Sequence, residues 1–214
     1  FDPSGGDLWM DSEQGSLFVA RLDSAGALEW AANAGPVSDA GLADLAVTAS
    51  GAVTLTASSR NAGDLDPGPG VYSFAPYYPG ASSQAFALTL NATGQFAWAS
   101  AFYYQTVDSI KALALDAEGN VLAAGVFSGL EDFDTGAGTS WLSCDHAYAF
   151  VTKRTARDCL LWAKPLVGVY DFGSDSVVPS QIATDAAGNV YVAGIFKGRV
   201  DFDPGPDVFV LASD

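Results

Sequence analysis

The stretch Ile182–Pro206 reads IATDAAGNVYVAGIFKGRVDFDPGP, which predicts a strand, a tight turn, a longer strand and an acidic loop rich in Pro and Gly. Nearly the same text occurs at Leu113–Gly138, LALDAEGNVLAAGVFSGLEDFDTGAG. A weaker copy occurs at Leu45–Gly70, LAVTASGAVTLTASSRNAGDLDPGPG. Repetition over this length indicates an array of similar structural units, and such an array decides the fold.

Four kinds of landmark repeat together along the chain, with spacings between 64 and 69 residues, and the repeats start near residues 1, 65, 133 and 202. The landmarks are the acidic loops at Asp2, Asp66, Asp134 and Asp203, the turn glycines Gly51, Gly119 and Gly188, the tryptophans Trp30, Trp98 and Trp162, and the phenylalanines Phe18, Phe86 and Phe150. Because these landmarks stay in step, we interpret them as one supersecondary unit copied about three times.

The composition narrows the class of protein. Hydrophobic residues make up 49% of the 214 residues, so disorder is not expected. The net charge of −16 argues against nucleic acid and against anionic membrane surfaces as partners. No run reaches the roughly 18 apolar residues that a membrane-spanning helix needs. The chain opens at Phe1 within a repeat landmark, so we expect a processed or excised segment.

Each unit is predicted to contain two kinds of hairpin. In the first kind, Leu17–Leu22 and Leu28–Ala32 flank Asp23–Gly26, where Asp can bond nearby amides and Gly supplies a positive φ. In the second kind, Ile182–Asp185 and Val190–Phe196 flank a turn that contains Gly188. The acidic excursion of some 20 residues separates the second and third strands of a unit. No stretch has a convincing helical periodicity, so we expect little or no helix.

Four antiparallel strands per unit, apolar on both faces, predict an all-β protein and a β-propeller built of four-stranded blades. The repeat of 64–69 residues gives this segment about three blades. We expect residues 1–214 to be a single β-propeller domain or part of a larger propeller. The equal placement of Trp30, Trp98 and Trp162 predicts that they are buried between blades.

The strings GNVYVAGIF, VDFDPGP, FVARLD and LEWA resemble the bacterial β-propeller repeat family often called SBBP. The resemblance covers essentially the whole chain and implies the propeller fold, but it carries little information about a ligand. The first copy departs most from the pattern, with Ser50-Gly-Ala52 in place of Gly-Asn-Val and with Ser58–Ala62 in place of a Gly-hydrophobic-Phe-x-Gly segment.

The two ends of the segment are predicted to be complementary. The chain starts with a third-and-fourth-strand hairpin and ends with a first-and-second-strand hairpin. Closure within one chain would give only three blades, fewer than the usual four to eight. We therefore expect flanking repeats of a longer chain to cover the ends, or else self-assembly in which two copies pair their end hairpins and supply six blades.

The acidic loops are the most specific chemical feature. Asp-x-Asp in an extended chain places two carboxylates on one side about 7 Å apart, and hard cations such as Ca²⁺ prefer oxygen ligands. The candidate metal ligands are Asp64, Asp66, Asp132, Asp134, Asp201 and Asp203. The interpretation that we favour over a metal site is that the second Asp of each pair caps a turn through backbone amides and the first is solvated. No other cofactor is indicated.

Catalysis has little support in the sequence. His146 is the single histidine, and Cys144 is near it only in sequence. On an alternating strand the two side chains would point the same way, so a Cys/His pair stays open. Cys144 and Cys159 are expected to be buried free thiols, with a disulfide as the alternative. We predict that the protein is not an enzyme.

Aromatic residues in predicted loops are the remaining candidate ligand-binding residues. They are Trp9, Tyr77, Tyr78, Tyr103 and Tyr104. Such residues can stack on sugars or anchor a protein partner, and the alternative is that they cover blade edges. The sequence thus favours a non-catalytic, extracellular or cell-surface scaffold that mediates structural or protein-binding interactions. A carbohydrate-binding propeller is the alternative, and a propeller enzyme comes third.

Overall fold

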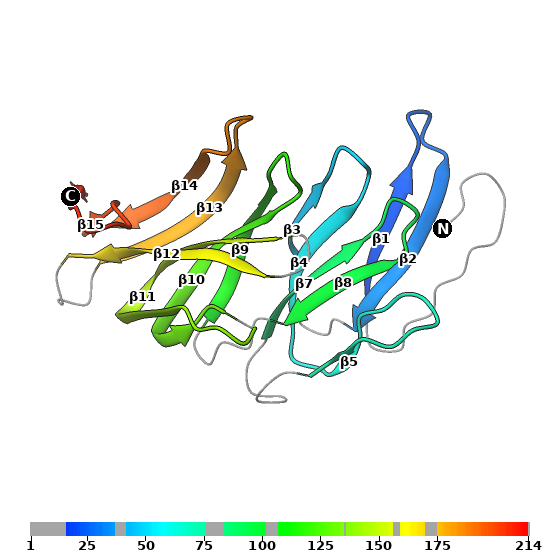
Figure 1. Cartoon of the computed structure of the whole chain (residues 1–214), viewed down its shortest axis with the longest axis horizontal. Coiled ribbons are helices and arrows are strands. Elements are labelled where there is room, and N and C mark those ends of the chain that lie inside the picture. The colour runs from blue at the N-terminus through cyan, green and yellow to red at the C-terminus, as the bar shows by residue number, and fades with distance from the viewer. Residues whose placement is uncertain are drawn as a thin grey trace. The chain divides into compact units, whose positions relative to one another are not determined.

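A computed structural model describes residues 16–36, 42–75, 84–101, 107–134, 136–155, 159–169 and 175–213 (Figure 1). These residues form strands, turns and loops and no helix, so the prediction of an all-β protein is confirmed. Accordingly, no helix of this part of the chain is long and apolar enough to cross a membrane. Contacts divide the chain into two compact units, Phe1–Leu42 with Val47–Ala101, and Ala43–Ala46 with Phe102–Asp214.

The first half of the chain contains a hairpin and a four-stranded sheet. The hairpin pairs β1 (Ser16–Leu22) with β2 (Leu28–Pro36). The sheet has the order β3-β4-β7-β8, with strands Leu42–Val47, Val53–Ser59, Gln84–Leu90 and Phe96–Ala101. The acidic excursion between β4 and β7 contains two short paired strands, β5 (Gly63–Asp64) and β6 (Ser73–Phe74).

The second half repeats this order of strands. The strands β9 (Val107–Leu115), β10 (Val121–Asp132), β11 (Trp141–Arg154) and β12 (Leu160–Gly168) form an antiparallel meander. A separate hairpin follows, β13 (Ser176–Thr184) with β14 (Val190–Lys197). Two complete sets of four strands and two hairpins are therefore present at the repeat spacing.

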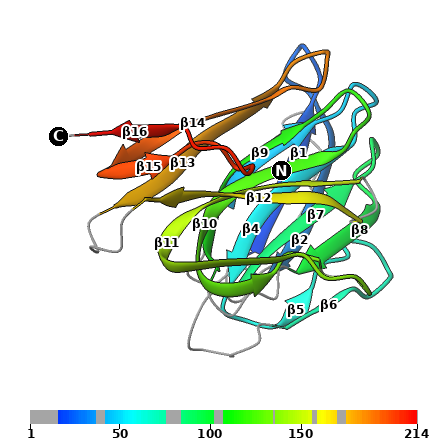
Figure 2. The ribbon, with the colours of Figure 1, turned by 60° about the vertical axis from the view of Figure 1, so that its left-hand side comes forward.

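The acidic excursions are more regular than the sequence predicts. In the middle repeat β10 and β11 stay paired as far as Asp132 and Trp141, so the excursion is the end of a long hairpin. In the last repeat β15 (Arg199–Asp201) pairs with β16 (Val210–Ala212). The strand β15 also pairs with β12, which belongs to the preceding repeat (Figure 2). These strands thus join the end of one repeat to the next.

Tight turns hold the hairpins in register through one repeated device. An Asp or Asn side-chain oxygen accepts hydrogen bonds from the amides two and four residues later, at 2.8–3.0 Å. The residues that do this are Asp23, Asn91, Asp116 and Asp185. A glycine in the left-handed region completes each turn, with Gly26 at φ 84° as one example. The predicted turn chemistry is confirmed.

The cores lie between neighbouring sheets of the same unit. In the first unit Val19 and Ala34 of the hairpin pack with Leu55 and Leu88 of the four-stranded sheet. In the second unit Leu122 and Ala124 of β10 pack with Ile182 of β13. Each hairpin therefore covers one face of a four-stranded sheet.

The three repeated tryptophans, Trp30, Trp98 and Trp162, are half-buried. The prediction of full burial is therefore wrong. Trp30 shows the reason, because its Nε1 donates to the carbonyl oxygen of Ala92 at 3.0 Å and its ring lies over Gly94. The indole therefore packs against a turn at the end of the neighbouring sheet, where one side stays open to water.

Two glycine substitutions test this packing. Gly94 and Gly26 both have positive φ, but a Cβ at Gly94 would lie 2.7 Å from the Trp30 ring, whereas a Cβ at Gly26 would meet nothing within 4 Å. We expect Gly26→Ala to cost only the backbone strain of about 1 kcal/mol. Gly94→Ala should cost about 1–3 kcal/mol more, as overpacking does. Urea unfolding measures both, and equal losses would contradict the proposed contact.

Candidate functional site

The first aspartate of each acidic loop bridges the two sides of that loop. Its Oδ1 accepts from the amide two residues later at 2.9–3.0 Å and from the amide eight residues later at 2.7–2.8 Å. The three residues with this pattern are Asp64, Asp132 and Asp201. The interpretation that the first aspartate is merely solvated is therefore wrong.

The second aspartate of each loop caps the following turn. Asp66, Asp134 and Asp203 accept from the amides of Gly68, Gly136 and Gly205, at 2.7, 2.8 and 2.7 Å. In the first two loops a glycine closes over the carboxylate, because a Cβ at Gly70 or Gly138 would collide with its Oδ2. The predicted turn cap is present in all three loops.

The residue between the two aspartates points into the core. Leu65 and Phe133 are fully buried, whereas Phe202 is half-buried. The ring centre of Phe133 lies 4.9 Å from the ring centre of Phe150 and 5.3 Å from that of Phe127. The alternation of Asp, apolar residue and Asp thus ties each loop to a sheet and leaves the carboxylates at the loop backbone.

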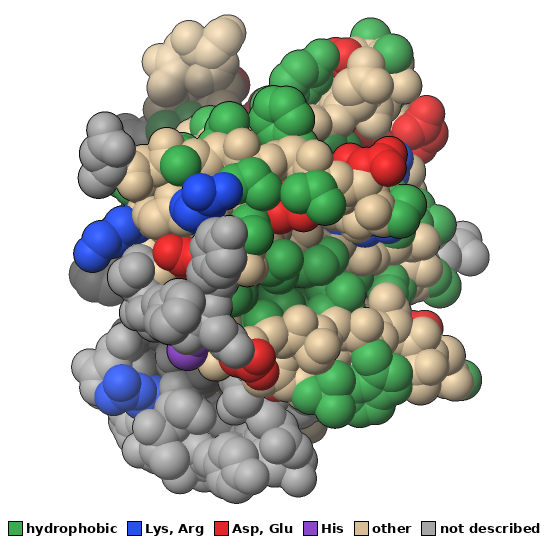
Figure 3. Space-filling model, turned by 90° about the vertical axis from the view of Figure 1, so that its left-hand side faces the viewer, with side chains coloured by type: hydrophobic (Ala, Val, Ile, Leu, Met, Phe, Trp, Pro, Cys, Tyr) green, Lys and Arg blue, Asp and Glu red, His purple; other side chains and the backbone are tan. Residues whose placement is uncertain are grey.

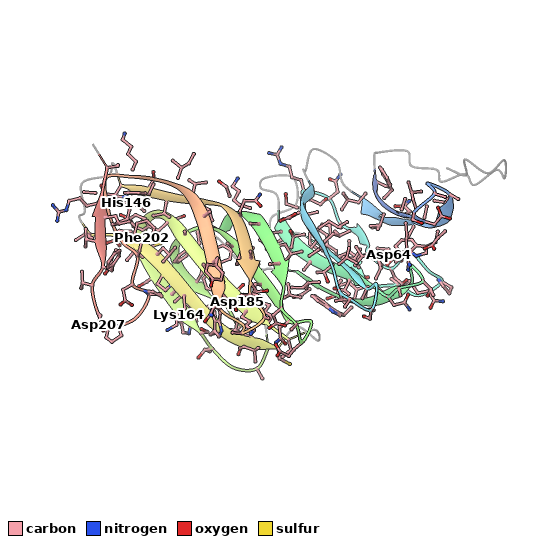
Figure 4. The ribbon with its side chains drawn as sticks, turned by 90° about the horizontal axis from the view of Figure 1, so that it is seen from above. Asp64, His146, Lys164, Asp185, Phe202 and Asp207 are labelled. Carbon is pink, nitrogen blue, oxygen red and sulfur yellow. The ribbon has the colours of Figure 1, made fainter. Side chains whose placement is uncertain are left out.

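Binding of Ca²⁺ to the six loop aspartates stays a prediction. Within the described residues, no group of three or more His, Cys, Asp or Glu side chains is arranged to hold a metal ion. Asp207 occupies the position in the third loop that Gly70 and Gly138 occupy in the others, and Figure 4 marks it in that loop. In all three loops the Oδ1 atoms of both candidate aspartates accept hydrogen bonds from backbone amides.

A groove of about 450 Å³ opens beside the first acidic loop, within the first unit. It is lined by Ser16, Asn33, Ala62, Gly63, Asp64, Asp66 and Pro67. The lining residues come from β1, β2 and the first acidic loop, and they include a serine, an asparagine and two aspartates. No local sequence pattern encodes this groove, since its walls lie some 30 residues apart in the chain.

The Cys144 thiol and the His146 ring make separate contacts. The Cys144 thiol donates to the carbonyl oxygen of Phe127 at 3.6 Å, and burial raises the pKa of this thiol above its usual value. The His146 ring lies edge-on to Tyr148, with the ring centres 6.4 Å apart. Cys144 also lines a second groove of about 310 Å³, together with Asp145 and Tyr148.

Both cysteines are free, as expected. The expectation that both are buried is wrong, because Cys144 is half-buried and Cys159 is exposed. Cys159 lies just before β12, and its amide donates to Thr155 Oγ1 at 3.1 Å.

The aromatic candidates Trp9, Tyr77, Tyr78, Tyr103 and Tyr104 all lie outside the described residues. A different set of exposed apolar side chains lies on the last hairpin. Tyr191 is 58% exposed, Ile195 is 75% exposed and Val178 is 40% exposed. Figure 3 views the molecule from the side of β13–β16 and shows hydrophobic side chains gathered on that face.

A buried ion pair holds one of the turns in the second unit. Lys153 Nζ lies 2.7 Å from Asp116 Oδ2, and Asp116 is 7% exposed. Burial alone would raise the pKa of Asp116, but hydrogen bonds from Lys153 and from the side chain and amide of Asn120 lower it to about 2. The equivalent Asp185 also has a lowered pKa, through hydrogen bonds from Asn189, so it is ionised at neutral pH.

No protein-family model matches this sequence, and no curated protein is significantly similar to it. The resemblance to the bacterial β-propeller repeats therefore stays a prediction.

Substitutions at Asp203 separate turn capping from metal binding. An Asn keeps the acceptor oxygen, so Asp203→Asn should change the free energy of unfolding little, whereas Asp203→Ala should cost about 1 kcal/mol. Thermal unfolding with and without a chelator measures both. A rise in melting temperature on adding Ca²⁺ that Asp203→Asn abolishes would instead establish a metal site.

The Asp116–Lys153 pair predicts a stability change in acid. The folded-state pKa of Asp116 is about 2, below its ordinary value of 3.8, so the stabilisation is present above pH 4 and is lost as the pH falls through 2. Wild type should lose about 2 kcal/mol more than Asp116→Asn over this interval. Urea unfolding at pH 4, 3 and 2 checks this, and parallel losses in the two proteins would contradict it.

Proposed function

We propose that this chain is a β-propeller segment of four-stranded blades that serves as a non-catalytic scaffold for structural or protein-binding interactions. The observation that carries the proposal is the identical hydrogen bonding of all three acidic loops. The loop aspartates accept hydrogen bonds from the backbone of their own loops. This contact gives them a structural role.

The strand order supports the propeller. The sheet β3-β4-β7-β8 and the meander β9 to β12 each have consecutive antiparallel neighbours, as a blade requires. The hairpin β13–β14 packs on β9 and β10 of the meander through Ile182. Stacking of similar sheets face to face is how repeat proteins bury surfaces that a single repeat leaves open.

The chemistry of the described side chains favours binding over turnover. A cysteine nucleophile needs a lowered pKa, and burial shifts the pKa of Cys144 the other way. The exposed apolar residues of β14 suit contact with a protein instead. We place the scaffold outside the cell or at the cell surface, where a net charge of −16 keeps it soluble.

A carbohydrate ligand is the alternative, and the first groove favours it. Asn33, Asp64 and Asp66 line about 450 Å³ of open space. Amide and carboxylate groups bind the hydroxyls of sugars, and aromatic residues stack on their faces.

Three measurements on the same protein separate these functions. For the scaffold we expect slow hydrogen exchange at the amides of Gly68, Gly136 and Gly205 without added metal, no binding on a glycan array and no turnover of p-nitrophenyl esters. Glycan binding that Asn33→Ala or Tyr77→Ala abolishes would overturn the scaffold in favour of a lectin. Turnover that both Cys144→Ser and His146→Ala abolish would overturn it in favour of an enzyme.

A further inference from the structure

Equivalent residues differ sharply in exposure between the middle of the chain and its two outer hairpins. On β10, Leu122 is fully buried and Val126 is 7% exposed, whereas their equivalents on β14, Tyr191 and Ile195, are 58% and 75% exposed. On β1, Phe18 is 56% exposed, whereas its equivalents Phe86 and Phe150 are 0% and 1% exposed. The outer hairpins therefore carry apolar side chains of a kind that the inner repeats bury.

The strand edges of the outer hairpins are complementary in the same way. In the inner repeats the second strand pairs with the third, as β4 with β7 and β10 with β11. The strand β14 is equivalent to β4 and β10, and β1 is equivalent to β7 and β11. Within the described residues, however, β14 pairs only with β13, and β1 pairs only with β2.

Both inner ladders predict one register for a contact between β14 and β1. This register places Gly194 opposite Phe18. The equivalent pair is Ala57 with Phe86 in the first ladder and Gly125 with Phe150 in the second. The same register places Tyr191 opposite Arg21. The equivalent pair is Thr54 with Thr89 in the first ladder and Leu122 with Lys153 in the second. Two independent ladders thus agree on the same partners.

An aromatic cluster gives a second, independent indication. In the middle repeat Phe127, Phe133 and Phe150 form a buried cluster with ring centres 4.9–6.2 Å apart. In the last repeat the equivalents of the first two, Phe196 and Phe202, stack edge to face at 5.3 Å. The equivalent of the third is Phe18. Figure 4 marks Phe202 on the last repeat.

The charges also match. Lys153 pairs with Asp116 in the middle repeat at 2.7 Å. The equivalents of these two residues are Arg21 on β1 and Asp185 at the turn between β13 and β14. Asp185 is marked in Figure 4, and it now accepts from Tyr191 Oη at 3.0 Å. Arg21 now pairs with Glu29 at 2.5 Å and donates to the carbonyl oxygen of Ala92, so a pair with Asp185 requires an exchange of partners on the exposed Arg21 side chain.

We propose that a second copy of this chain docks here, with its β1 pairing antiparallel along β14 and its Phe18 completing the cluster of Phe196 and Phe202. Arg21 of one copy then lies beside Asp185 of the other. If the contact forms in both directions, the pair contains six sets of four strands, a number within the range of propellers. Addition of a strand to an open sheet edge is an established mode of protein recognition. The inference rests on the proposed four-stranded blade.

Cysteine cross-linking between two differently labelled chains tests the register. In a Cys144→Ser, Cys159→Ser background, one chain carries Arg21→Cys and the other carries Tyr191→Cys. Mixing the two under oxidising conditions should give a disulfide-linked dimer, and this product forms only between copies. A chain with Lys197→Cys, six residues further along β14, is the matched control and should not cross-link with Arg21→Cys.

Light scattering of the unmodified chain gives the second measurement. We expect a mass of twice 22.1 kDa. Phe18→Glu should raise the dimer dissociation constant by at least about tenfold, as loss of a central aromatic anchor does. Val71→Glu is the control, because Val71 is 76% exposed and its equivalents Thr139 and Val208 are exposed as well.

A compact monomer of 22.1 kDa with no cross-linked dimer would overturn the inference. The proposed scaffold would survive that result if the loop amides still exchange slowly. A circular dichroism spectrum of Phe18→Glu that matches wild type shows that loss of the dimer is not loss of the fold.

Discussion

Strands that are apolar on both faces impose the main constraint on this protein. All seven residues of β7 are buried, and so are the first seven residues of β10, Val121–Phe127. A sheet built from such strands must be covered on both sides, because neither face can be left in water at low cost. Within each half of the chain a hairpin supplies part of this cover, as β13 does where Ile182 packs against Leu122 of β10.

Aspartate solves the second problem, which is the backbone at the ends of these sheets. Tight turns and short loops leave amides without ladder partners, and an Asp or Asn oxygen accepts two of them at once in the turns that begin at Asp23 and Asp185. In each acidic loop the first aspartate accepts two amides in this way and the second accepts one. Part of the excess of 25 acids over 9 bases therefore has a structural cause, so acidity alone is weak support for a metal or a basic partner.

Local chemistry made much of this structure predictable from the sequence. The hairpins, the turns and the capping role of Asp66, Asp134 and Asp203 depend on residues that are close in the chain. The pairing of β15 with β12 and the Asp116–Lys153 pair join distant segments, and no local pattern encodes them. The degree of burial of Trp30 is not encoded locally either, since it depends on how far the turn at Ala92 and Gly94 reaches over the ring.

Differences between the repeats carry more information about function than their similarities. Arg154 is fully buried and donates to the carbonyl oxygen of Phe133, yet the equivalent residues in the other repeats are Leu90 and Leu22. Glu131, also buried, corresponds to Gly63 and Val200. Buried charges need partners, and the apolar equivalents indicate that the fold itself does not require a charge at either position. The same comparison singles out Tyr191, whose equivalents Thr54 and Leu122 are buried. A side chain required only by the fold would recur in each repeat, so a specific role is best sought where one repeat departs from the others.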